Sequence, residues 1–183
     1  MTIIDRLRAA RELKGLIAER RGRLYKVAYA WCGERHLADD LVQEAMTRAM
    51  GKCHQLRDET RLDSWLYSIL NNCWREHLRG QRADFELDDD TLACTRCPER
   101  INLSGELAER VFELIAYLPE GQRQVLSLVA LEGLSYREVA DTLDIPIGTV
   151  MSRLSRARRF LADRIGAAAA PPRVSRPYLR RVK

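Results

Sequence analysis

The sequence has few of the features that mark secreted or membrane-embedded chains. Its 183 residues contain no run near the ~18 apolar residues that a membrane-spanning helix needs. The stretch from Met1 to Arg21 is charged throughout and lacks the apolar segment of a secretory signal, so a cytoplasmic protein is expected. Five cysteines, an odd number in such a chain, favour free thiols over a disulfide framework.

Signs of catalysis are also scarce. The three histidines (His36, His54 and His77) are scattered along the chain, and no Ser/His or Cys/His arrangement of a nucleophilic site stands out. The chain has no G-x-x-x-x-G-K-[ST] loop that would cradle a nucleotide phosphate. We therefore expect a protein that is not an enzyme, with no catalytic residues and no cofactor.

One C-x-x-C pair, Cys94 and Cys97, raises the question of a metal. Zinc would need two further ligands, and the nearest candidates are Cys73 and His77, one turn apart on an expected helix. A lone C-x-x-C is a weak signal, so free thiols and no metal are expected, with a redox switch as the alternative.

The pattern of apolar residues predicts an all-α fold of two small helical domains joined by a flexible linker. Helical periodicity is clear over 24–32, 36–50 and 65–79, where Asp63 or Ser64 is expected to cap the third helix after a polar loop. The stretch 83–105 is acidic, contains Pro98 and loses the periodicity, which indicates a linker. The expected domains are 1–82 and 106–165, and 166–183 is expected to be a basic, disordered tail.

The second domain ends in a predicted helix-turn-helix over 134–161. Ser135 and Glu138 have the spacing of a capping box at the start of its first helix. The segment 144–148 contains Pro146 and Gly148 and breaks the helix, and Thr149 is a candidate cap for the second one. One face of that second helix is apolar and is expected to be buried. The opposite face carries Ser152, Arg153, Ser155, Arg156 and Arg159.

A cationic second helix of this kind fits the major groove of duplex DNA. The modest net charge of +5 is compatible with nucleic acid without proving it. The other interpretation is an amphipathic helical hairpin with a solvated basic face. DNA binding is favoured because the arginines cluster on the second helix, and Ala140 is small where two helices must cross.

Two helices of the first domain leave similar choices open. Acidic residues in the N-terminal half of 36–50 complement the helix dipole, and they would also suit docking of a basic helical partner. The helix 65–79 combines aromatics with amides and arginines, which suits stacking on single-stranded nucleic acid. The alternative is a core helix, because tryptophans such as Trp65 and Trp74 are more often buried than used as stacking platforms.

The order and spacing of three blocks resemble bacterial sigma factors of the extracytoplasmic-function (ECF) group, in the sigma-70 family. The blocks are 39–44, 65–72 with the arginines that follow, and 118–150. The resemblance extends over about 24–165. It implies a dissociable subunit that brings RNA polymerase core to specific promoters and is controlled by an anti-sigma factor.

The resemblance also implies a role for individual residues. Contact with RNA polymerase core falls to Asp40, Gln43 and Glu44. Reading of the opened −10 element falls to Arg61, Trp65, Asn71, Asn72, Arg75 and Arg79. Reading of the duplex −35 element falls to Thr149, Ser152, Arg153, Ser155, Arg156 and Arg159. Met151 departs from the family, because many relatives carry a basic residue there, and this departure could shift the −35 preference.

Another class of protein that ends in a helix-turn-helix is the two-component or quorum-sensing regulator. Such a regulator would carry a sensor or receiver domain with a parallel sheet before the DNA-binding unit. The first half of this chain is expected to be helical throughout, which disfavours that class.

Overall fold

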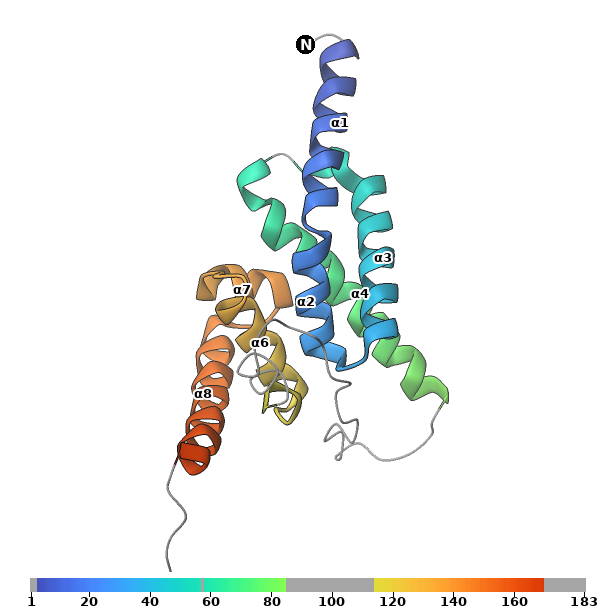
Figure 1. The fold of residues 1–183 in the computed structure, drawn as a ribbon. Helices are drawn as coiled ribbons and strands as arrows, with labels where there is room; N and C mark the ends of the chain where they lie inside the picture. The colour runs from blue at the N-terminus through green and yellow to red at the C-terminus, as the bar shows by residue number, and fades with distance from the viewer. Residues whose placement is uncertain (1–2, 57, 85–113, 170–183) are drawn as a thin grey trace, which may run out of the picture.

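The computed structural model describes residues 3–56, 58–84 and 114–169. They form α-helices and two short 3-10 helices, with no strand in these ranges, so the all-α prediction is confirmed (Figure 1). The first unit comprises α1 (Ile3–Glu19), α2 (Arg21–Cys32), α3 (Arg35–Lys52), η1 (Cys53–Gln55), η2 (Glu59–Arg61) and α4 (Leu62–Asp84). The second unit comprises α6 (Glu120–Ala130), α7 (Tyr136–Leu143) and α8 (Ile147–Ala169).

The first unit is built on α2 and α3, which form a helical hairpin. Gly33 ends α2 in the left-handed region, with φ of 71°, and its N–H donates to the carbonyl of Tyr29. α4 packs along α3, and the three helices bury the apolar faces that the sequence predicted. Leu24, Val27 and Trp31 of α2 are almost completely shielded from solvent.

The start of α4 differs from the sequence prediction. The helix begins at Leu62, so neither Asp63 nor Ser64 is its cap. The Asp63 carboxylate instead accepts hydrogen bonds from Arg20 Nε at 3.1 Å and Arg23 Nη1 at 2.7 Å. Those two cations hold it against the α1–α2 junction. Before α4, Asp58 caps η2 by accepting from the N–H of Thr60.

In the second unit, α7 and α8 form the predicted helix-turn-helix. The capping box is complete, because Ser135 Oγ accepts from the N–H of Glu138 and the Glu138 carboxylate accepts from the N–H of Ser135. Asp144 ends α7 with φ of 55°, and it is the one non-glycine residue with positive φ among the described residues. Aspartate tolerates this region because its short polar side chain can bond locally.

Two predictions about α8 need correction. Thr149 lies inside the first turn and is not the cap, because the carbonyl of Pro146 already accepts from the N–H groups of Thr149 and Val150. The helix also continues to Ala169, so residues 166–169 of the predicted tail are helical. Residues 83 and 84 of the predicted linker belong to α4, and the rest of the linker, 85–105, lies outside the described residues, as does the remaining tail.

The two units pack directly against each other. α2 lies along α6, α4 lies against α7, and the buried side chains of both units belong to one continuous hydrophobic cluster. Figure 1 shows α6 and α7 beside α2 and the middle of α4, with α8 on the outside of the second unit. The sequence predicted two separate domains, and nothing in its local patterns indicated this shared core.

Candidate functional site

The exposed face of α8 carries the residues predicted to read duplex DNA. Val150, Leu154 and Ala157 are buried against the rest of the second unit, which turns the opposite side of the helix outward. The outward side chains are Ser152, Ser155, Arg156 and Arg159. This is a polar, cationic helix surface of the kind that enters a major groove.

Arg153 is placed differently from its neighbours. It is half-buried, and its guanidinium lies against Gly121 at the start of α6. A Cβ built on Gly121 would come within 2.7 Å of Arg153 Cζ, so the missing side chain at this position makes room for the cation. In this arrangement Arg153 reaches toward α6, and its predicted DNA contact would require a turn of the side chain.

The predicted polymerase-binding face on α3 is open. Asp40, Gln43 and Glu44 are exposed, and together with Thr47 and Arg48 they line a shallow hollow. Positions 40, 44 and 47/48 recur about once per helical turn, so these side chains share one face of the helix.

Sequence reasoning did not single out Arg48, which ties this face to α4. Its guanidinium makes a two-pronged contact with Glu76, with Nη1–Oε1 and Nη2–Oε2 distances of 3.0 and 2.6 Å, and it also bonds Glu44 one turn earlier on α3. The hydrogen bond to Arg48 lowers the pKa of Glu76. Arg48 thus holds the Glu44 carboxylate in place. The spacing of four residues between Glu44 and Arg48 on one helix could have predicted their ion pair from the sequence.

The residues predicted to read opened DNA divide into two groups. Arg61, Asn72, Arg75 and Arg79 are exposed, and Trp65 is half-buried. Asn71 is only 3% exposed, because it lies between α4 and the second unit. Its Oδ1 accepts from Gln124 Nε2 at 3.2 Å, and its Nδ2 donates to the carbonyl of Thr142 at 3.5 Å. The DNA-reading role of Asn71 remains a prediction, and it requires the two units to separate.

The contact between the units also uses two tryptophans. Trp31 is fully buried on α2, and its indole N–H donates to Ser127 Oγ on α6 at 2.7 Å. Trp74 on α4 is nearly buried, and its indole N–H donates to Glu120 Oε1 at the start of α6 at 3.0 Å. The prediction left Trp74 open between core and stacking platform, and in this conformation it is part of the core.

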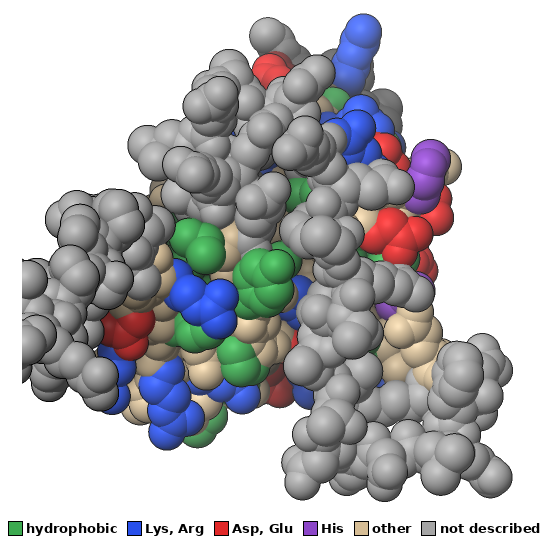
Figure 2. Space-filling view, turned by 60° about the horizontal axis from the view of Figure 1, so that its bottom comes forward, with side chains coloured by type: hydrophobic (Ala, Val, Ile, Leu, Met, Phe, Trp, Pro, Cys, Tyr) green, Lys and Arg blue, Asp and Glu red, His purple; other side chains and the backbone are tan. Residues whose placement is uncertain are grey.

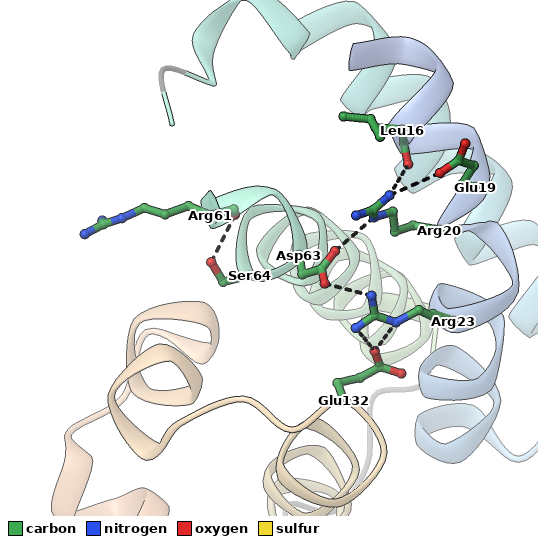
Figure 3. A network of polar contacts seen from close by, with 8 residues as sticks. All are labelled: Leu16, Glu19, Arg20, Arg23, Arg61, Asp63, Ser64 and Glu132. Carbon is green, nitrogen blue, oxygen red and sulfur yellow. Dashed lines mark hydrogen bonds and ion pairs between the residues drawn. The ribbon is translucent and has the colours of Figure 1, made fainter. Parts of the chain in front are cut away.

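An ionic network surrounds one edge of the contact between the units (Figure 3). Arg23 on α2 bridges Asp63 of α4 and Glu132 of the α6–α7 connection, with closest N–O distances of 2.7 Å to each carboxylate. The Glu132 side chain is only 2% exposed. Burial and a hydrogen bond to Glu132 raise the pKa of the Tyr67 hydroxyl. Figure 3 shows Arg61 pointing away from this network on the outer side of α4.

The cysteines that the structure describes all lie in the first unit. Cys32, Cys53 and Cys73 are buried free thiols. Burial raises the pKa of Cys32 and of Cys73 to about 11, so the reactive thiolate is disfavoured. Among the described residues no cluster of His, Cys, Asp or Glu could hold a metal ion. Cys94 and Cys97 lie outside those residues.

Charge is distributed unevenly over the surface. In Figure 2, blue Lys and Arg side chains lie at the lower left, the side of the second unit, and at the upper right, and most of the red Asp and Glu side chains lie at the right edge. The molecule therefore presents separate acidic and basic surfaces to its partners.

In the parts of the chain that are described, no helix is both long and apolar enough to cross a membrane.

Comparison with known proteins agrees with this arrangement. Residues 16–83 match the family model "Sigma-70 region 2", and residues 108–161 match "Sigma-70, region 4". The chain is 36% identical over 138 residues to the ECF RNA polymerase sigma-E factor of Haemophilus influenzae, which covers 69% of this chain and 73% of the relative. It is 37% identical over 136 residues to the RNA polymerase sigma-H factor of Pseudomonas aeruginosa, which covers 68% and 70% respectively.

Two solved structures share the fold. The sigma factor RpoE of Bartonella quintana, solved with the anti-sigma factor NepR, aligns with a TM-score of 0.67 at 24% identity, over 85% of this chain and 97% of that one. CnrH, solved with the cytosolic domain of CnrY, aligns with a TM-score of 0.61 at 24% identity, over 86% and 89%. Both family regions and relatives above 30% identity cover most of the chain, which therefore belongs to the ECF group of the sigma-70 family of sigma factors.

Proposed function

We propose that this chain is a dissociable transcription initiation subunit that directs RNA polymerase core to a specific set of promoters. The observation that carries the proposal is the presence of both sigma regions in one short chain, each with an exposed surface of the required chemistry. The acidic face of α3 suits a basic polymerase surface, and the cationic face of α8 suits duplex DNA. The protein acts in the cytoplasm, where its polymerase and promoters are found.

The proposed division of labour follows the two units. Asp40, Gln43 and Glu44 dock on the polymerase, and Arg61, Trp65, Asn71, Asn72, Arg75 and Arg79 hold the opened −10 strand. Thr149, Ser152, Arg153, Ser155, Arg156 and Arg159 read the −35 duplex. Strand opening draws on binding energy alone, since unpaired bases can be held by stacking and by cations along the backbone.

An anti-sigma protein is a further proposed partner. Both solved neighbours are complexes with a protein partner, named as an anti-sigma factor in one case. In this chain such a partner would act by covering the α3 and α8 surfaces or by stabilising the packed arrangement of the two units.

The test is binding of the purified chain to RNA polymerase core, followed by transcription from a promoter library. Tight binding with transcription from a narrow promoter set is expected. Glu44→Lys should weaken core binding, whereas Arg156→Ala should weaken promoter selection and leave core binding nearly intact. Sequence-specific duplex binding without any core binding would make the chain a free-standing regulator and would overturn the proposal.

A further inference from the structure

Two large apolar side chains are exposed in the first two turns of α8, on the flank between its buried stripe and its polar face. Met151 is 55% exposed and Ile147 is 50% exposed. Of the five large hydrophobic side chains that are exposed among the described residues, these two lie on the same helix, one turn apart. Single exposed apolar residues are common on any protein surface. A pair of them beside the surface proposed to meet DNA indicates contact with an apolar group of the ligand.

The core of the second unit does not use this pair. Val150, Leu154 and Ala157 already fill the buried side of α8. At 100° per residue, Ile147 and Met151 are about 40° apart around the helix axis, and Ser155 continues the same row one turn further on. The row ends at the exposed Arg159, about 40° beyond Ser155, so Met151 borders the polar, cationic face of α8.

We infer that Met151, supported by Ile147, recognises the 5-methyl group of thymine in the −35 duplex. In the major groove thymine is the one natural base that presents a methyl group, and apolar side chains are the groups that distinguish it. The neighbouring arginines supply phosphate and base contacts, so the apolar pair adds specificity rather than general affinity. This inference rests on the proposed function, because it assigns a substrate feature to the same α8 surface.

The flexible thioether side chain of methionine suits this role. An unbranched chain with a polarisable sulfur adapts to an apolar surface of irregular shape. Burying one methyl group is worth a modest but measurable gain, which corresponds to about threefold to fivefold in affinity for each thymine read.

The experiment removes the methyl group alone. Full-length chain bound to RNA polymerase core is used to select −35 sequences from a randomised promoter duplex pool. Each thymine of the selected −35 sequence is then replaced singly by deoxyuridine, which keeps every hydrogen-bonding group. At one or two positions we expect the affinity for the deoxyuridine duplex to be threefold to fivefold lower than for the thymine duplex. Met151→Ser should bring this thymine-to-deoxyuridine affinity ratio close to one, and Ile147→Thr should reduce the ratio.

Met50→Ser is the matched control, because Met50 is an exposed methionine on α3, away from α8. It should leave the thymine-to-deoxyuridine ratio unchanged. Equal affinity for thymine and deoxyuridine at every position, or an unchanged ratio in Met151→Ser, would overturn the inference while the proposed function stands. Failure to select any sequence would overturn the proposed function itself, and this inference with it.

Discussion

The packed arrangement of the two units makes a quantitative prediction about the Trp31–Ser127 hydrogen bond. Both side chains are 0% exposed, and the N–O distance is 2.7 Å. Trp31→Phe would remove the donor and part of the ring. We expect a loss of about 1–2 kcal/mol for the broken buried hydrogen bond and about 1 kcal/mol for lost apolar contact. Ser127→Ala should cost about 1–2 kcal/mol, because the indole N–H is left without an acceptor.

A double-mutant cycle separates this contact from general destabilisation. The free energy of unfolding of the full chain, its two single variants and the double variant would be measured by urea denaturation. Because the two residues belong to different units, a coupling energy of about 1 kcal/mol is expected only if the units pack in solution. A Ser135→Ala and Glu138→Gln cycle within α7 is the control, since its coupling does not depend on that packing. Coupling below about 0.3 kcal/mol for Trp31–Ser127, with the control intact, would refute the packed arrangement.

Two further predictions concern ion pairs and caps. Arg48→Ala should weaken binding to RNA polymerase core about threefold to tenfold by releasing Glu44, with little loss of stability, because exposed ion pairs contribute at most about 1 kcal/mol. A core-binding titration checks this against Lys52→Ala, and equal affinities would refute the role of Arg48. Ser135→Ala should destabilise the fold by about 1 kcal/mol. Hydrogen bonds to Ser135 lower the pKa of Glu138, so its contribution is present at neutral pH and is lost as pH falls through that lowered value. Glu138→Gln should flatten this acid dependence in pH-resolved urea denaturation, and an unchanged pH profile would contradict it.

The elements that could be predicted from the sequence are those set by neighbouring residues. The capping box at Ser135 and Glu138 and the buried stripe of α8 each depend on spacings of three or four residues, which a single chain displays directly. The predicted caps of α4 and α8 were wrong for a related reason. Asp63 bonds Arg23 instead of capping α4. The carbonyl of Pro146 accepts the first hydrogen bonds of α8, so Thr149 does not cap that helix.

The contacts between the units could not be predicted in this way. Trp31 and Ser127 are 96 positions apart, and Asn71 and Gln124 are 53 apart, so no local pattern joins them. The helical periodicity over 24–32 indicated a buried face, but it could not say that part of the surface covering Trp31 belongs to the other unit. For the same reason the sequence-based prediction placed Asn71 on an open surface. No local sequence signal shows whether an amide on a helix bonds a buried partner or solvent.

Asn71 is buried, whereas the face of α3 is open. Base capture by Asn71 therefore carries the free-energy cost of a conformational change, and polymerase docking on α3 does not. In the proposed function, polymerase docks on Asp40, Gln43 and Glu44, which are already exposed, so the docking affinity is not reduced by any rearrangement of the chain. Base capture by Asn71 needs the separated form, and its apparent affinity is reduced by the fraction of molecules in that form. The free chain is thereby biased against stray single-stranded DNA. A ligand that prefers the separated form would restore capture, and the polymerase would then act as an activator of its own specificity subunit.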